Sequence, residues 1–353
     1  MKNKFMNGIA DEIWASLSAR DASEWDLRCP PRFITGDMIE GTFEAFGDAG
    51  VLHLGVTFPS SGCERAEVYV DPWMVNGFGL RPGDRVQGEA DQTGGGMPKL
   101  QTVEAVNGLR PDRAWQRPDF SRLVPVYPDE QLLLSVTGPD EAVDGESTMR
   151  DIDAYAPIGK GTRALVIAPA AADRACLLAH MAASIETNNP EVELFVLLLG
   201  GRNFDPACMS AAASGGEVIC LDRFESPSRH VRAAALTIER AKRLVELGAD
   251  VAVLMDGITL LSDSCARVCG DRRAAIYESR LLFGAARNIE NGGSLTIIAT
   301  AFEERKDIIS IMTDVSTASI RLTHSRLDNE FPGIDSKRSW CRRDDLFHRG
   351  RGL

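Results

Sequence analysis

The stretch that decides the fold of this chain is VIAPAAADRACLL, residues 166–178. An apolar run over residues 164–168 predicts a buried strand, a short loop of small residues follows, and the pattern from Ala175 to Ile185 predicts a helix. This order is the strand, loop and helix of a phosphate-binding loop, GxxxxGK[ST]. The phosphate-holding residues are missing, because the last three motif positions read Asp173, Arg174 and Ala175.

Strands and helices alternate on both sides of this stretch, from Asp151 onward. Apolar strands of four to six residues, each followed by a helix, predict a mainly parallel sheet covered on both faces. The other predicted strands are LFVLLL (194–199), EVICL (217–221), VAVLMD (251–256), SLTIIAT (294–300) and IRLTH (320–324). Predicted helices lie near 206–214 and over 230–247 and 272–288.

The residues before Asp151 follow a different pattern. Five short alternating strands between residues 33 and 107, with an LRPGD turn before the fourth, predict a small closed barrel of the OB type. The first 30 residues predict an amphipathic helical segment with Phe5, Ile9, Ile13 and Leu17 on one face. The predicted organisation is a helical segment (1–32), a barrel (33–108), a linker (109–150), an α/β domain (151–345) and a basic tail (346–353).

Composition and charge argue against a membrane-spanning protein, a secreted protein and a protein whose surface is generally coated by nucleic acid. The 353 residues are 44% hydrophobic and 25% charged, as in a globular protein, and no apolar run is long enough to span a membrane. The N-terminus lacks the apolar core of a secretion signal, and the eight cysteines are scattered without a CxxC pair. We therefore expect a cytoplasmic protein with free thiols and no metal site. A net charge of -12 argues against a generally nucleic-acid-coated surface.

Five further stretches carry a specific resemblance. They are APIGKGTRALVIAP (156–169), SPSRHV (226–231), TIERAKRLVELGADVAVLMDGITLL (237–261), FGAARNIENGGSLTIIATA (283–301) and FPGIDSKRS (331–339). Through them the chain resembles the bacterial transcription termination factor Rho family, over roughly residues 35–345, as a divergent, degenerate paralogue. The resemblance implies a RecA-like P-loop ATPase-type domain after an OB or cold-shock-like barrel. Members of that family form rings and are RNA-dependent ATPases.

The resemblance places the family's phosphate loop on residues with altered chemistry. The matching positions are Pro169, Ala172, Asp173, Arg174 and Ala175. A carboxylate about 4 Å from a phosphate charge costs about 1 to 4 kcal/mol, so Asp173 opposes ATP binding. Ala175 removes a Mg²⁺ ligand, and Arg174 keeps a positive charge without the compact ammonium geometry.

The catalytic positions that the resemblance implies are vestigial. Gly200 and Gly201 stand where the family has the acidic residues that activate water. Asp256 ends a strand at the Walker B position, Arg202 persists beside the missing glutamate, and Arg326 matches the arginine that a neighbouring subunit inserts. Two interpretations stay open for Asp256, a Mg²⁺ ligand through water or a strand-end carboxylate that caps the next segment. Arg326 could also serve only a subunit contact.

The RNA contacts implied by the resemblance are eroded too. The family's base-stacking positions fall on Val51, His53 and Gly55, with another near Met97. Because stacking contributes about 1 to 3 kcal/mol per base, these replacements remove most of the expected affinity. The weak candidates that remain are Glu67 and Tyr69 in the barrel, and Arg272 and Arg273 at the central pore. Tyr69 could equally be a half-buried strand aromatic, and the two arginines a solvated helix start.

Three functions remain open from the sequence. The first is a pseudo-ATPase without ATP hydrolysis or RNA translocation, which binds a protein partner and modulates transcription termination or Rho itself; it needs no cofactor. The second is a divergent but active RNA-dependent ATPase that uses ATP and Mg²⁺. The third is a non-catalytic module for single-stranded RNA that uses the basic tail and the Tyr69 pocket. Because the chain ends soon after residue 347, where the family continues with a helical segment, homo- or hetero-oligomer formation and ring closure stay open.

Overall fold

The computed structural model describes residues 37–62, 66–91, 97–135, 145–169, 174–200, 213–323 and 332–347. The chain divides into two units, one of residues Met1–Pro118 with Ala235–Arg243 and one of Asp119–Ala234 with Leu244–Leu353. The predicted N-terminal helical segment lies outside the described residues. So do most of the helix expected near 206–214 and all but two residues of the basic tail.

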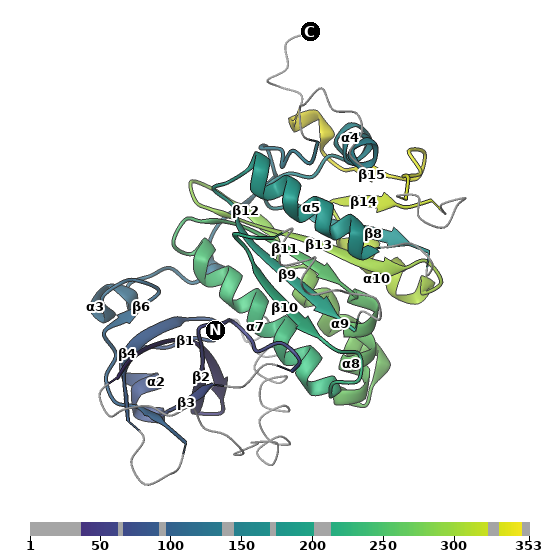
Figure 1. The fold of residues 1–353 in the computed structure, drawn as a ribbon. Helices are drawn as coiled ribbons and strands as arrows, with labels where there is room; N and C mark the ends of the chain where they lie inside the picture. The colour runs from purple at the N-terminus through teal and green to yellow at the C-terminus, as the bar shows by residue number, and fades with distance from the viewer. Residues whose placement is uncertain are drawn as a thin grey trace, which may run out of the picture. The chain divides into compact units, whose positions relative to one another are not determined.

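The first unit contains a closed five-stranded barrel (Figure 1). Its strands are β1 (Asp37–Phe46), β2 (Ala49–Leu54), β3 (Glu67–Val70), β4 (Arg85–Asp91) and β5 (Lys99–Leu100), with β6 (Ala105–Val106) beside β4. The ring closes because β1 pairs antiparallel with both β2 and β4, while β5 joins β3 to β4. Helix α2 (Pro72–Phe78) follows β3, and the short α3 (Pro111–Ala114) follows β6. The predicted OB-type barrel is confirmed.

Alternation along β3 and β4 separates a core from an outer face, whereas four successive residues of β2 are buried. Phe43, Leu52 and Val68 are fully buried inside, with Met74 of α2 packed against them. Gly83 in the predicted LRPGD turn has a φ of 84°, which favours glycine over any other residue. The turn therefore sets the entry into β4.

The second unit contains a mainly parallel sheet. Its strand order is β10 (Glu217–Leu221), β9 (Glu193–Leu199), β11 (Asp250–Asp256), β13 (Ser294–Phe302), β8 (Arg163–Ala168), β14 (Ala318–Arg321) and β15 (Trp340–Cys341). All neighbours from β10 to β14 are parallel, and β15 is antiparallel. Two short antiparallel strands, β12 (Arg287–Ile289) and β7 (Pro125–Val126), extend from β13.

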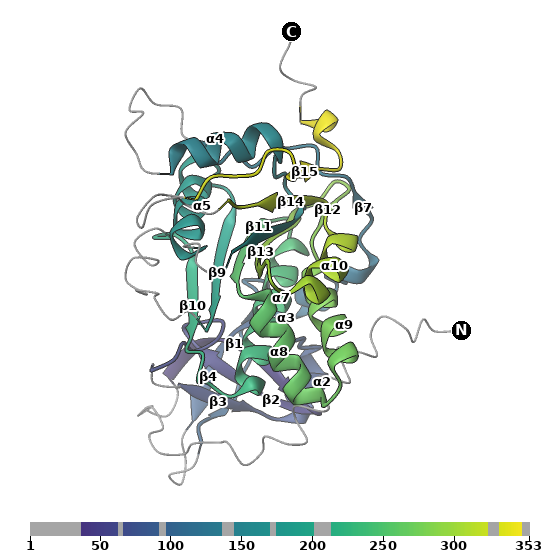
Figure 2. The ribbon, with the colours of Figure 1, turned by 90° about the vertical axis from the view of Figure 1, so that its right-hand side faces the viewer.

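Helices cover both faces of this sheet (Figure 2). Helix α5 (Arg174–Asn188) lies on one side, and α8 (Ile258–Cys269), α9 (Arg272–Phe283) and α10 (Lys306–Val315) lie on the other. Alternate residues of β8 show the layering, because Ala164, Val166 and Ala168 pack in the cluster that contains α5. The intervening Leu165 and Ile167 are buried as well. The predicted RecA-like α/β architecture is confirmed.

The segment predicted as a linker, residues 109–150, contributes to the α/β core. Leu132 and Leu134 are fully buried in the cluster that contains α5, and Leu132 donates its backbone N–H to the carbonyl of Ile158. Helix α4 (Glu146–Tyr155) begins inside the segment, and the Asp153 carboxylate accepts the backbone N–H groups of Leu134 and Ser135. The described parts of this proline-rich and acidic segment are therefore packed against the α/β core.

Several element boundaries differ from the prediction, three of them by more than one or two residues. The expected strand LQTVEAV is divided into β5 and β6, because Gln101 and Thr102 both direct their N–H groups to the carbonyl of Glu89 and leave the regular ladder. The expected helix over 272–288 ends at Phe283, and β12 follows. The long helix α7 (Pro227–Val245) begins three residues before the predicted start at His230.

Candidate functional site

The residues at the phosphate-loop position lie at the carboxyl ends of the central parallel strands. β8 ends at Ala168, β11 at Asp256 and β13 at Phe302, and α5 begins at Arg174. Pro169 is buried directly after β8. The intervening residues, including the predicted Ala172 and Asp173, lie outside the described residues. Ligands of open α/β sheets bind at this edge.

Arg174 forms a direct ion pair with Asp256. Its Nε lies 3.0 Å from Asp256 Oδ1, and the two side chains are only 17% and 3% exposed. The guanidinium also stacks on the ring of Phe302 at 4.2 Å. The first residue of α5 therefore spans to the neighbouring strand ends and neutralises the Walker B carboxylate.

Asp256 accepts a second hydrogen bond on the same oxygen. Thr300 Oγ1 donates to Asp256 Oδ1, and the backbone N–H of Gly257 donates to Thr300 Oγ1. The carboxylate is thus held by β13 as well as by α5. Sequence reasoning singled out Arg174 and Asp256 separately but did not predict their contact or the part played by Thr300.

In this arrangement two donors already occupy Asp256 Oδ1. An aspartate at this position acts on the metal through a water molecule, so a donor on its oxygen competes with that water. Arg174 already occupies Asp256 Oδ1, and Ala175 has no hydroxyl to offer the metal. Binding of a metal–nucleotide complex would require the buried ion pair to open, so the ligand would have to replace the partner of each charge.

The end of β9 leaves little room for a side chain at Gly200. Gly200 has a φ of 71°, and a Cβ there would lie 2.3 Å from Leu260 Cδ2 and 3.2 Å from Arg223 Cβ. A carboxylate-bearing residue at this position would need both neighbours to move. The predicted vestigial residues Arg202 and Arg326, and Gly201, lie outside the described residues, so their positions stay a prediction.

Two of the predicted stacking positions of the barrel, Val51 and His53, are buried, whereas Gly55 is exposed and Met97 is partly exposed. Val51 and His53 are each 1% exposed, and His53 Nε2 lies 2.7 Å from Glu44 Oε2 inside the protein. His53 Nδ1 also lies 3.5 Å from the predicted Glu67. The family's stacking positions therefore hold a buried polar cluster in this chain, with Phe58 5.3 Å from the His53 ring.

Tyr69 remains partly accessible. It faces Val51 across the β2–β3 pair, and the ammonium of Lys99 lies 5.5 Å from the centre of its ring. Glu67 is also partly exposed, two residues earlier on β3. The structure places the two predicted residues on one strand, with one cation beside them.

Arg272 and Arg273 lie at the start of α9, as predicted. Arg272 Nη2 is 2.6 Å from Asp307 Oδ2, and Arg305 binds both Asp307 and Asp263. The hydrogen bond from Arg272 lowers the pKa of Asp307 to about 2, with Arg305 acting in the same direction. Of the two predicted arginines, Arg272 is thus engaged in an ion-pair network between α9 and α10 that sequence reasoning missed.

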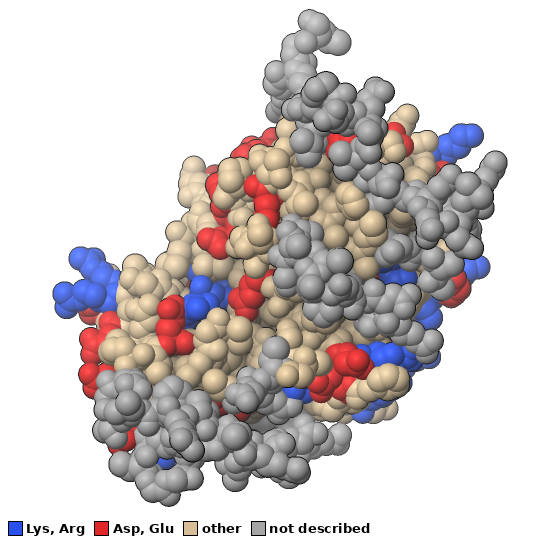
Figure 3. All heavy atoms as spheres, viewed as in Figure 1, with Lys and Arg blue, Asp and Glu red and all other residues tan. Residues whose placement is uncertain are grey.

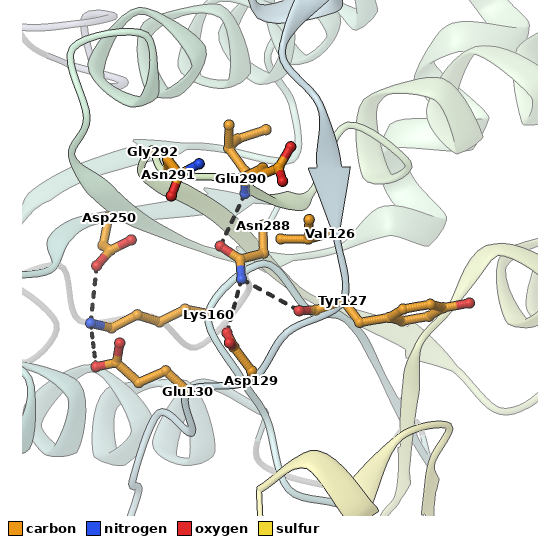
Figure 4. A pocket seen from close by; sticks show the side chains of 11 residues that line it. Val126, Tyr127, Asp129, Glu130, Lys160, Asp250, Asn288, Glu290, Asn291 and Gly292 are labelled. Atoms are coloured by element: carbon orange, nitrogen blue, oxygen red, sulfur yellow. Dashed lines mark hydrogen bonds and ion pairs between the residues drawn. The ribbon is translucent and has the colours of Figure 1, made fainter.

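A cavity lies at the opposite end of the sheet, away from Asp256 (Figure 4). Its volume is about 420 Å³, and Lys160 crosses it with its Nζ 2.6 Å from Glu130, 2.9 Å from Glu191 and 2.9 Å from Asp250. Burial of Lys160 lowers its pKa, but the hydrogen bonds to these carboxylates outweigh burial and raise it. The cavity is acidic at its rim and does not coincide with the phosphate-loop position.

Charges of both signs are interspersed over the face of the molecule shown in Figure 3. Among the described residues, no helix has the length and apolar character needed to cross a membrane. Within the same residues, no group of three or more His, Cys, Asp or Glu side chains is arranged to hold a metal ion.

Comparisons with known proteins identify relatives over most of the chain. A protein of Cereibacter sphaeroides named "Transcription termination factor Rho" is 36% identical over 92% of this chain and 84% of its own length. Proteins of the same name from Bacillus subtilis and Streptomyces lividans are 37% and 38% identical over 87% and 79% of this chain, and the chain spans 74% and 41% of their lengths. No protein-family model matches the chain.

A solved structure supports the fold. The chain is similar to the structure described as "a unique ATP synthase subunit NeqB from Nanoarcheaum equitans", with a TM-score of 0.52 and 17% identity over 64% of this chain and 58% of that one. At this identity the likeness shows the architecture alone.

Proposed function

Because this chain belongs to the transcription termination factor Rho family, we propose that it is a member of that family that no longer turns over ATP and acts through contacts with other proteins. In this proposal it modulates transcription termination, and another Rho-type subunit or the transcription machinery is its partner. The α/β unit and the barrel then serve as a scaffold for binding.

The Arg174–Asp256 ion pair is the observation that carries the proposal. A hydrolytic site needs the strand-end carboxylate for its metal, whereas here that oxygen accepts Arg174 and Thr300 together. Breaking a buried pair without supplying new partners costs about 3 to 5 kcal/mol, which is comparable to the whole binding free energy of a millimolar ligand, about 4 kcal/mol. Nucleotide affinity would be reduced accordingly.

The barrel supports the same proposal. Base stacking needs exposed aromatic rings, and the family's positions are here the buried Val51 and His53. Residues 34–110 also carry 11 acidic and 5 basic side chains, a balance that repels phosphate. We therefore do not expect this unit to bind RNA with high affinity.

Exposed apolar side chains favour a protein partner. Phe224 is 86% exposed at the turn before α7, and Tyr277 and Leu281, one turn apart on α9, are 45% and 39% exposed. Side chains of this kind are enriched where proteins bind one another.

The decisive experiment restores the lost loop. The wild-type chain, the triple variant Asp173→Gly/Arg174→Lys/Ala175→Thr and the matched single variant Arg174→Lys are titrated with a fluorescent ATP analogue, with and without Mg²⁺. RNA-stimulated phosphate release is measured in parallel. We expect wild type and Arg174→Lys to bind more weakly than about 1 mM, and the triple variant to bind more tightly. Micromolar binding with phosphate release by wild type would instead support the active-ATPase alternative.

The partner is tested separately. The chain is sedimented alone and in a mixture with the Rho protein of the same cell. The comparison shows whether the two proteins form one complex or remain separate species. We expect a species that contains both chains. If the two sediment independently at micromolar concentration, Rho is not the partner, whereas the conclusion on ATP turnover still depends on the first experiment.

A further inference from the structure

Three arginines at the amino-terminal edge of the α/β sheet have no acidic partner in the part of the chain that the structure describes. Arg163 opens β8, Arg287 opens β12 and Arg342 directly follows β15. No carboxylate of a described residue lies within 4.0 Å of their guanidinium groups. By contrast, Arg174 in the same unit is paired with Asp256. This edge is the opposite end of β8 from the phosphate-loop position.

Backbone carbonyls hold Arg163 beside Arg287. Arg163 Nε donates to the carbonyl of Val315 at 2.6 Å, and its Nη1 donates to the carbonyl of Ala286 at 2.7 Å. Ala286 directly precedes Arg287, so the two side chains start from adjacent points. Arg163 is half-buried and has no freedom to move to a distant acid.

Arg342 reaches the same place from the C-terminal strand. Its backbone N–H donates to the carbonyl of Thr317, whose side chain accepts the N–H of Arg163. Its Nη2 donates to the carbonyl of Asp314 at 3.1 Å, at the end of α10. Three separate segments of chain thus bring three positive charges together.

Aromatic rings lie beside these arginines. The Arg287 guanidinium stacks over the ring of Phe120 at 4.7 Å, and that of Arg342 lies 5.8 Å from the ring of Trp340. Tyr127 is 61% exposed, and its side chain points away from the acidic cavity in Figure 4. A flat cation held on a ring keeps its in-plane N–H groups available for an anion.

The cluster is not explained by helix capping alone. Cations at the end of α10 are favourable, and this accounts for the contacts of Arg163 and Arg342 with its last carbonyls. Arg287 does not take part, because its only hydrogen bond to a described residue is a long one of 3.4 Å to Ala285. Burial, followed by repulsion from Arg287 and Arg342, lowers the pKa of Arg163. Arg163 is therefore repelled by both Arg287 and Arg342, and no carboxylate of a described residue pairs with any of the three.

We propose that Arg163, Arg287 and Arg342 form a binding site for a phosphate group. Guanidinium groups bind phosphate oxygens with paired, charge-assisted hydrogen bonds, and an anionic phosphate group between them reduces their repulsion. The phosphate belongs either to a free polyphosphate or to the backbone of a single-stranded nucleic acid, whose bases the neighbouring rings can stack. This site is independent of the proposed loss of ATP turnover.

The test uses the full chain and two probes, inorganic tripolyphosphate and a short uridine oligonucleotide, measured by calorimetry at fixed ionic strength. Arg287→Gln and Arg342→Gln remove one charge each. Arg338→Gln is the matched control, because Arg338 is 67% exposed elsewhere on the same unit. Arg174→Gln reports any binding at the phosphate-loop position.

We expect Arg287→Gln and Arg342→Gln to weaken tripolyphosphate binding by about tenfold each, with both control variants unchanged. We also expect Arg287→Gln to keep or raise the melting temperature without ligand, because it relieves repulsion; this separates lost binding from unfolding. If the oligonucleotide loses affinity in the same variants, and the slope of its log affinity against log salt concentration falls by about one, the bound phosphate is that of a nucleic-acid backbone. If only tripolyphosphate binding changes, the bound phosphate is that of a free polyphosphate.

Two results would overturn the proposal. One is that neither probe depends on Arg287 or Arg342. The other is that an oligoglutamate binds with the same dependence on Arg287, since the cluster would then be an unselective cationic surface that an acidic protein segment could occupy.

Discussion

The coupling between Arg174 and Asp256 is the most direct quantity to measure. We predict that Arg174→Met and Asp256→Asn each destabilise the chain by about 3 kcal/mol, and that the double variant loses about 3 to 4 kcal/mol. The interaction energy is then about 2 to 3 kcal/mol. The reason is that either single change leaves its partner with an uncompensated charge, whereas the double change removes both charges.

The magnitude follows from the geometry. Two unit charges 3.0 Å apart attract by about 5.5 kcal/mol at an effective dielectric constant of about 20. Desolvation of Asp256, which is 3% exposed, offsets part of this attraction, and Arg174 at 17% exposure retains some contact with water. The hydrogen bond from Thr300 persists in every variant, because asparagine also offers an oxygen.

The assay is a double-mutant cycle by denaturant unfolding, supported by thermal melts. For a unit of this size, a loss of 3 kcal/mol lowers the melting temperature by about 6 to 12 °C. The control cycle uses Arg321→Met and Glu303→Gln, a pair 24% and 35% exposed, for which we expect coupling below about 1 kcal/mol. Coupling below about 0.5 kcal/mol for Arg174 and Asp256 would refute the view that this pair replaces a metal ligand in the native state.

Three further changes test other parts of the molecule. Lys160→Met leaves three carboxylates facing one another and should destabilise the chain by about 1 to 3 kcal/mol in chemical unfolding. The control variant Lys242→Met removes a lysine from an ion pair on a helix and should cost less than about 1 kcal/mol. Val51→Phe restores an aromatic ring at a stacking position but enters a buried site, so we expect about 1 to 3 kcal/mol of destabilisation and no gain in RNA affinity by filter binding; a gain would contradict the burial argument. The depressed pKa of Asp307 contributes stability above about pH 4, and this stability is lost as the pH falls towards 2. Asp307→Asn should reduce that loss in acid titrations monitored by circular dichroism, by only a few tenths of a kcal/mol because the pair is exposed. An unchanged profile would argue against the contact between Asp307 and Arg272.

Periodicity was sufficient for the fold because each strand has a strong local signal. The runs at 164–168 and 251–256 are continuously apolar, as expected for parallel strands covered on both faces, and they form β8 and β11. The turn at Gly83 and the alternating strands predicted the barrel in the same way. Local backbone pairing is not visible in the sequence: Gln101 and Thr102 both donate to the carbonyl of Glu89, and one predicted strand became two.

The site was less predictable because it depends on which side chains meet. The sequence shows that Arg174 and Asp256 are charged, but 82 positions separate them, and only the parallel pairing of strands brings them into contact. Burial of Val51 and His53 is also a tertiary property, since alternation places both on the outer face of the barrel, where a sequence pattern predicts exposure. Leu132 and Leu134 were hidden in a segment whose proline and acidic content indicates a linker.

The ion pair also changes what Asp256 means as a motif residue. A carboxylate that ends a buried strand needs a positive partner, and in a metal-dependent site that partner arrives with the ligand. Here the first residue of α5 supplies it, and the ring of Phe302 lies against the same guanidinium. The folded state then does not depend on a bound ion for the stability of this edge. A strand-end aspartate in the expected place is therefore weak evidence for nucleotide turnover unless the residue at the start of the following helix leaves its oxygens accessible.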